Sequence, residues 1–84
     1  MRLEFDVNAF EDLNYFIFHD RKKAIKIMKI LEDILRNPFS GIGKPEPLKY
    51  EFEGCWSRRI DQEHRVVYQV EKNTVIILAC RYHY

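Results

Sequence analysis

Three short stretches of the sequence carry side chains that could act together on a phosphodiester. Cleaving RNA through its own 2′-hydroxyl needs a base for that hydroxyl, cations for the phosphorane oxygens and an acid for the leaving 5′-oxygen. Glu46, Arg65 and His83 supply one group of each kind. Further candidates lie close to them in the sequence: Lys44, Lys49, Arg58, Arg59, Arg81 and Tyr84. These residue types therefore allow acid–base cleavage of RNA.

Glu46 lies between Pro45 and Pro47, in a loop at residues 37–47 that holds all three prolines of the chain. A proline has a fixed φ and disfavours helical geometry in the residue before it, so we expect Glu46 to be extended. A stiff loop loses little conformational entropy when it presents a carboxylate to a substrate. The loop is also long enough for a functional role to become more common.

The same residues also fit an interpretation without function. Arginines on an exposed sheet face are usually solvated, and a histidine near a chain end is usually incidental. The proline-rich loop can be a rigid turn and nothing more. Basic residues on a helix more often form a solvated face than a binding site; here they are Arg21, Lys22, Lys23, Lys26, Lys29 and Arg36. Residue types alone leave both interpretations open.

A short strand at residues 2–5 and two consecutive helices are predicted in the first half of the chain. Asp6 or Asn8 can cap the first helix, and Asp20 can open the second after almost no loop, which gives an antiparallel helical hairpin. The expected apolar face of the first helix is Phe10, Leu13 and Ile17. That of the second is Ala24, Ile27, Met28, Leu31, Ile34 and Leu35. Asn37 and Pro38 should end the second helix.

Antiparallel strands are predicted in the second half. Leu48, Tyr50 and Phe52 alternate with charged residues, as in a strand. The runs "CWSRRI" and "RVVYQV" flank a turn at residues 61–64, and "EKNT" leads into the last strand. We therefore expect an α+β fold in a single domain of residues 1–84. It has an N-terminal strand, a helical hairpin and a twisted, mainly antiparallel sheet with the helices packed on one face.

The turn at residues 61–64 predicts how the candidate residues meet. If it closes symmetrically, Arg59 and Arg65 lie opposite each other on one sheet face, which is unfavourable unless an anion lies between them. The next hairpin brings residues 80–84 alongside the start of "RVVYQV". Parity alone does not place His83 and Tyr84 on the same face. A bulge, or the freedom of a last residue, is needed for that.

Composition limits the class of protein. The net charge of +1 hides an acidic start, since residues 1–20 hold one arginine and five acids, and a basic remainder that suggests a polyanionic partner. Cys55 and Cys80 fit neither a metal site nor a disulfide framework, and we expect reduced cytoplasmic thiols. The chain lacks an apolar signal region and a run long enough to span a membrane. We expect no metal and no cofactor.

Several of these stretches together resemble a known family. "GKPEPLK", "WSRRI", "EHRVVY" and the terminal "RYHY" look like the YoeB toxins of the RelE/ParE superfamily, which belongs to bacterial toxin–antitoxin systems. The resemblance covers the whole chain. It implies a RelE/ParE-like fold and a ribosome-dependent endonuclease that cleaves translated mRNA in the A site. It also implies a metal-independent reaction that leaves a 2′,3′-cyclic phosphate.

The resemblance also implies a role for each candidate. Glu46 is then the general base and His83 the general acid, Arg65 stabilises the transition state, and Tyr84 orients the substrate. Lys44, Lys49 and Arg59 bind phosphate. The implied partners are the ribosome and its mRNA, a YefM-like antitoxin whose C-terminal segment covers the site, and often a second toxin copy.

Two other functions compete with this one. A toxin of the same superfamily could bind DNA gyrase without cleaving anything, or the chain could bind the ribosome without catalysis. An acid, a base and several cations together argue against both, because protein binding does not require them.

Overall fold

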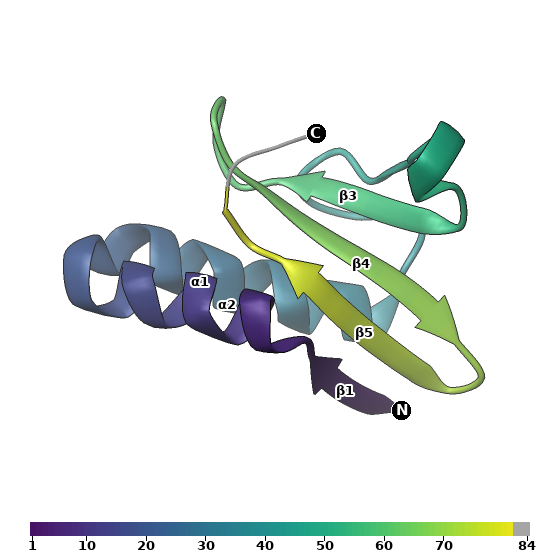
Figure 1. Ribbon diagram of the computed structural model, residues 1–84, viewed down its shortest axis with the longest axis horizontal. Helices are drawn as coiled ribbons and strands as arrows, with labels where there is room; N and C mark the ends of the chain where they lie inside the picture. The colour runs from purple at the N-terminus through teal and green to yellow at the C-terminus, as the bar shows by residue number, and fades with distance from the viewer. Residues whose placement is uncertain (82–84) are drawn as a thin grey trace.

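The computed structural model describes residues 1–81 of the chain. Its elements are, in order, β1 (Arg2–Phe5), α1 (Val7–His19), α2 (Arg21–Arg36), β2 (Glu46–Pro47), a 3-10 turn (Tyr50–Phe52), β3 (Cys55–Arg59), β4 (Arg65–Glu71) and β5 (Thr74–Ala79). The five strands form one sheet in the order β1-β5-β4-β3-β2. β1 runs parallel to β5, and the other neighbours are antiparallel. Figure 1 shows both helices against one face of this sheet, which confirms the predicted α+β fold.

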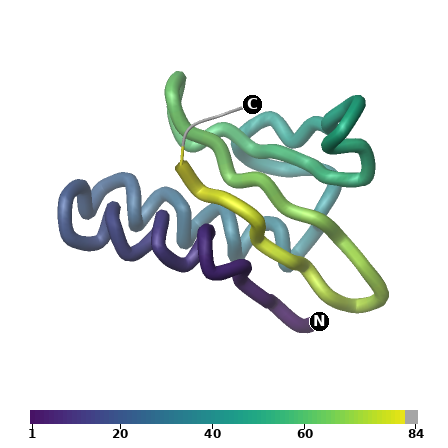
Figure 2. Tube along the Cα trace, viewed as in Figure 1, coloured from purple at the N-terminus to yellow at the C-terminus, as the bar shows by residue number. Residues whose placement is uncertain are grey.

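Local capping explains where the helices begin. Asp6 caps α1, with its carboxylate accepting a hydrogen bond from the Asn8 N–H. Asp20 closes α1 and caps α2 through the Lys23 N–H, so a single residue separates the two helices. In Figure 2 the turn between the helices and the turn between β4 and β5 lie at opposite ends of the view. Neither helix is long and apolar enough to cross a membrane, within the residues that the structure describes.

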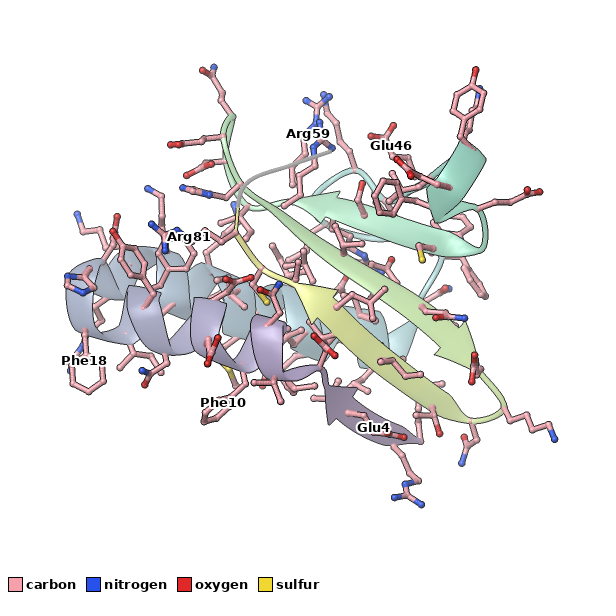
Figure 3. The ribbon with its side chains drawn as sticks, in the orientation of Figure 1. Glu4, Phe10, Phe18, Glu46, Arg59 and Arg81 are labelled. Atoms are coloured by element: carbon pink, nitrogen blue, oxygen red, sulfur yellow. The ribbon has the colours of Figure 1, made fainter. Side chains whose placement is uncertain are left out.

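The buried face of α1 differs from the predicted one. Ala9 and Phe16 are buried and Leu13 packs against them, whereas Phe10 is 62% exposed and Ile17 47% exposed. In Figure 3, Phe10 points away from the sheet. Both stripes have helical spacing, so the choice between them depends on tertiary contacts. One such contact is the hydrogen bond from the Asp6 N–H to the carbonyl of Ile77, which fixes how the chain enters α1.

The prediction for α2 is largely confirmed. Four of its expected core residues are buried: Ala24, Ile27, Leu31 and Ile34. Met28 and Leu35, predicted in the core, are exposed, and Ile30 is buried in their place. The buried stripe is thus turned slightly about the helix axis, as in α1. The outer sides of both helices therefore keep large apolar side chains at the surface.

The strand at residues 48–52 was predicted wrongly. The ladder to β3 consists of Glu46 and Pro47, and Leu48 adds a hydrogen bond from its N–H to the carbonyl of Cys55. Tyr50 then has a φ of +60°, which is incompatible with a strand, and residues 50–52 form a 3-10 turn. Alternation of polar and apolar residues was therefore a misleading signal here. Proline suits β2 because this strand lies at the sheet edge.

Candidate functional site

Strand register gathers the central candidates on one face of the sheet. Arg59 lies opposite Arg65, as predicted, and Glu46 lies opposite Ser57. Directly opposed residues point to the same side, and so do residues two apart on one strand. Glu46, Ser57, Arg59 and Arg65 therefore share the face turned away from the helices, which we call the open face.

Glu46 and Arg65 contact each other directly. Arg65 Nη1 donates a hydrogen bond of 3.1 Å to Glu46 Oε1. The Glu46 side chain is 55% exposed and that of Arg65 22% exposed, so solvent screens the pair. An exposed ion pair contributes about 1 kcal/mol or less, and an incoming phosphate could therefore replace the carboxylate on the guanidinium. The carboxylate and the cation that cleavage requires are in this way adjacent and accessible.

Arg59 and Lys44 lie together beside this pair. The Arg59 N–H donates a 2.6 Å hydrogen bond to the carbonyl of Gly43, which holds the loop against β3 just before Lys44. Both side chains line a surface hollow of about 350 Å³. Lys26 of α2 and Asp61 line the same hollow, so it holds three cations and one carboxylate. Figure 3 shows Arg59 and Glu46 at the same edge of the molecule.

The remaining candidates are not part of this group. Lys49 is exposed at the start of the 3-10 turn and lines a different hollow with Leu48 and Tyr50. His83 and Tyr84 lie outside the described residues, and their predicted roles stay predictions. The structure thus brings together Glu46, Arg65, Arg59 and Lys44 of the predicted set.

Arg58 is the residue whose role the sequence analysis missed. It precedes Arg59, so its side chain points to the opposite side of the sheet, towards α2, and it is fully buried. It donates hydrogen bonds to the Asp33 carboxylate, to the Tyr68 hydroxyl and to three loop carbonyls. The accepting carbonyls are those of Asn37, Ser40 and Ile42. All five N–H donors of the guanidinium group can be used in such an arrangement.

The hydrogen bonds of Arg58 hold in place the loop that leads to Glu46. Asp33 also accepts a 3.0 Å hydrogen bond from the Ile42 N–H, and the Tyr68 hydroxyl donates one of 2.6 Å to the carbonyl of Pro38. Gly41, with a φ of +131°, approaches the Asp33 carboxylate so closely that a Cβ there would lie 1.9 Å from Oδ2. The parity of Arg58 relative to Arg59 was the sequence signal for this role.

Two pKa shifts reflect this network. The hydrogen bond from Arg58, followed by that from the Ile42 N–H, lowers the pKa of Asp33 below its ordinary value of 3.8. Burial raises the pKa of Tyr68 above its ordinary value, against the opposing effect of Arg58. Asp33 therefore stays charged and Tyr68 neutral at physiological pH, which matches their hydrogen bonds.

Ser57 is the contrasting polar residue of β3. It is fully buried beneath the open face, between Glu46 and Val67 in register. Its hydroxyl makes no hydrogen bond within the residues that the structure describes. A buried hydroxyl without a partner destabilises the fold.

One of the two features that the sequence analysis named, a bulge, is present in β5. Tyr68 lies opposite Ile77, but the preceding residue, Val67, lies opposite Ala79, so Leu78 is an extra residue in this strand. Asn8 Nδ2 donates a 3.3 Å hydrogen bond to the carbonyl of Leu78. A bulge bends a strand and changes the side to which later side chains point. It shifts the pairing of β5 with β4 by one residue after Ile77.

Comparisons with known proteins agree on one family. The family described as "YoeB-like toxin of bacterial type II toxin-antitoxin system" matches residues 5–84. Toxin RelK of Mycobacterium tuberculosis is 51% identical over 98% of this chain and 96% of its own. Among solved structures, the YoeB/ParE toxin from Agrobacterium tumefaciens has a TM-score of 0.97 at 38% identity, with complete coverage of both chains.

YoeB from Staphylococcus aureus has been solved as a dimer and in a complex with YefM. The structure of the YoeB dimer from Staphylococcus aureus has a TM-score of 0.92 at 47% identity and covers all of this chain and 98% of that one. A YoeB toxin from Staphylococcus aureus has also been solved in a heterotetrameric YoeB-YefM complex, with a TM-score of 0.90, 47% identity and coverage of 100% of this chain and 98% of that one.

Proposed function

This chain belongs to the YoeB-like toxins of bacterial type II toxin–antitoxin systems, and we propose that it inhibits translation as a ribosome-dependent mRNA endonuclease. The observation that carries the proposal is the contact between Glu46 and Arg65 on the open face, beside Arg59. The pair places a carboxylate that can accept the proton of a hydroxyl beside a cation that can stabilise the attacking alkoxide and the phosphorane oxygens. A surface used only for protein binding has no need of that pair.

The reaction would proceed by attack of the 2′-hydroxyl on the adjacent phosphorus. Glu46 accepts the proton of that hydroxyl, and Arg65 moves its hydrogen bonds from Glu46 to the phosphorane oxygens. His83 donates a proton to the leaving 5′-oxygen, and Tyr84 orients the substrate. The products are a 2′,3′-cyclic phosphate and a free 5′-hydroxyl. No metal or cofactor is needed, because each charge and proton has a side chain assigned to it.

The cations around the pair would bind the RNA backbone. Arg59 and Lys44 line one hollow, which suits a phosphate close to the reacting one. Lys49 is exposed at the start of the 3-10 turn, and we assign to it a phosphate of the RNA that flanks the reacting one. Such contacts add affinity that falls with salt concentration. The small open face offers little surface to bend RNA, so we assign that positioning to the ribosome, which would place the toxin in the cytoplasm.

We also propose two protein partners, a YefM-like antitoxin and a second copy of the toxin. The outer faces of α1 and α2 expose large apolar side chains, and apolar side chains that gather on one surface often mark a protein interface. The residues concerned are Val7, Phe10, Ile17, Phe18, Ile25 and Met28. In Figure 3, Phe10 and Phe18 point to the same side of α1, away from the sheet. An acidic segment of the antitoxin would neutralise the cations of the open face as it folds on binding.

Mapping of mRNA 5′ ends after incubation with translating ribosomes tests the function. Wild-type protein should cut in the A site and leave naked RNA largely intact. Removal of His83 and Tyr84, or His83→Gln alone, should lower the single-turnover rate by about 10²–10⁴ while ribosome binding and cooperative melting persist. Equal rates on naked RNA and on ribosomes would contradict the proposal. Ribosome binding without cleavage by the wild type would favour a non-catalytic ribosome-binding protein, and a lack of both binding and cleavage would favour a gyrase toxin.

A further inference from the structure

Helix α1 holds the end of β5 after the bulge. The carboxylate of Asp12 accepts a 2.9 Å hydrogen bond from the backbone N–H of Cys80. The guanidinium carbon of Arg81 lies 3.5 Å from the centre of the Tyr15 ring. Asp12 and Tyr15 are three residues apart, so they lie on the same side of the helix. Figure 3 shows Arg81 beside α1, above the helix.

Both contacts are favourable. Cys80 is fully buried, so its N–H cannot turn to water in place of Asp12, and the acceptor is an ionised group. The Arg81 distance is well inside the range of about 6 Å for a cation–π contact. Burial, together with the charge of Asp12, raises the pKa of the Cys80 thiol to about 12, so the carboxylate faces a neutral sulfur.

These contacts replace sheet pairing where pairing stops. β5 ends at Ala79, and Cys80 bonds to a helix instead of continuing the ladder with β4. The sequence continues from Arg81 to His83, the candidate general acid, and to Tyr84, the residue expected to orient the substrate. His83 follows Arg81 by two positions, and a chain spans at most about 7 Å over two residues. The anchor at Arg81 therefore limits where an imidazole at position 83 can act.

We propose that Asp12 and Tyr15 are positioning residues of the cleavage reaction, because together they fix the place and direction from which the chain continues to His83 and Tyr84. The inference rests on the proposed function, since positioning has meaning only if these two residues act on the substrate. Neither Asp12 nor Tyr15 touches the substrate in this scheme. Their contribution is to hold the chain end so that an acid there needs little reorganisation before reaction.

Two pairs of substitutions separate positioning from loss of structure. Asp12→Ala removes the acceptor of the Cys80 N–H, whereas Asp12→Asn keeps an amide oxygen that can accept the same bond. Tyr15→Leu removes the ring, whereas Tyr15→Phe keeps it. Glu11→Ala and Asn14→Ala are matched controls, because both residues are exposed on the same helix next to the tested positions.

Single-turnover cleavage on programmed ribosomes is the first measurement, with ribosome affinity measured in parallel. We expect Asp12→Ala to lower the rate by about tenfold or more and Tyr15→Leu by about fivefold, with unchanged affinity, since small misplacements of a reacting group cost large factors in rate. Asp12→Asn and Tyr15→Phe should restore most of the rate. Rates for Asp12→Ala and Tyr15→Leu within twofold of the controls would overturn the proposal, as would a lack of rescue by the conservative variants.

Trimming by a carboxypeptidase is the second measurement and needs no ribosome. Release of Tyr84 should be faster in Asp12→Ala and Tyr15→Leu than in the controls, because the chain end opens locally more often. If His83→Gln cleaves as fast as wild type, the proposed function fails, whereas trimming still reports on the anchor. If His83→Gln is inactive but Asp12→Ala and Tyr15→Leu match their controls in both measurements, the positioning proposal alone fails. Tyr15 is a surface residue, so its variants keep the test decisive even if Asp12→Ala fails to fold.

Discussion

The two faces of strand β3 use similar side chains for opposite purposes. On the side of the helices, Arg58 is fully buried and its guanidinium group is surrounded by hydrogen-bond acceptors. On the open face, Arg59 is exposed and lies opposite Arg65, another cation. A charge whose donors are all satisfied by the protein cannot bind a substrate. Two adjacent cations that share a single exposed carboxylate as partner can bind one.

The comparison shows that the open face depends on the side of β3 that faces the helices. Arg58 ties the loop at residues 37–44 to α2 through Asp33, and that loop leads directly to Glu46. Arg59 and Arg65 need only the sheet register to meet. Substitutions on the helix-facing side should therefore alter stability first, and substitutions on the open face should alter catalysis first.

The largest effect on stability is expected for Arg58→Met. The substitution removes the donor to the partly exposed Asp33 carboxylate and to three loop carbonyls, and each buried acceptor left without a donor costs about 1–3 kcal/mol. Together these losses are a large part of the roughly 5–15 kcal/mol that stabilises a small domain. Urea unfolding followed by the fluorescence of Trp56 measures it. Arg59→Met is the matched control and should change stability by about 0.5 kcal/mol or less; similar losses in both variants would contradict the contrast between the faces.

The largest effect on catalysis is expected for Arg65→Ala. Loss of a cation that stabilises the transition state typically costs about 10²–10³ in rate, whereas the fold should survive because the residue lies on the open face. Lys49→Ala is the comparison, since a contact to a flanking phosphate should affect mainly binding and its dependence on salt. Single-turnover cleavage on ribosomes measures both. Equal rate losses would show that Lys49 also acts in the transition state.

The sequence predicted the residues of the open face better than the packing between the helices and the sheet. Hairpin turns and strand parity are local properties, and they placed Arg59 opposite Arg65 correctly. The helix faces depend on packing between distant elements, and the stripe with Phe10 and Ile17 fitted the helical period as well as the buried stripe with Phe16 did. The loop network around Arg58 joins residues up to 30 positions apart, which no local pattern reveals.

On the side that faces the helices, we expect a smaller change in stability when the charge of Asp33 is lost in acid. The pKa of Asp33 is lower in the folded protein than its ordinary value of 3.8, so its charge stabilises the fold above that pH. This stability is lost as the pH falls below 3.8 through the folded pKa. Asp33→Asn should therefore be less stable than wild type at neutral pH, with a difference that shrinks on acidification. Urea unfolding at several pH values measures it, and Glu32→Gln, an exposed neighbour, is the control; a difference independent of pH would contradict the role of the charge.

The smallest effect is expected for Ser57→Ala, which tests the other buried polar residue of β3. Arg58 is buried with all its partners, whereas the Ser57 hydroxyl is buried without one among the described residues. Removing an unsatisfied hydroxyl and leaving a methyl group should be neutral, or should stabilise the protein by up to about 1 kcal/mol. Cleavage should stay within about twofold of wild type, because a fully buried side chain does not reach the substrate. A loss of stability comparable to that of Arg58→Met would show that Ser57 has a partner in the protein. A loss of activity without a loss of stability would instead move Ser57 into the reaction, next to Glu46, its neighbour in register.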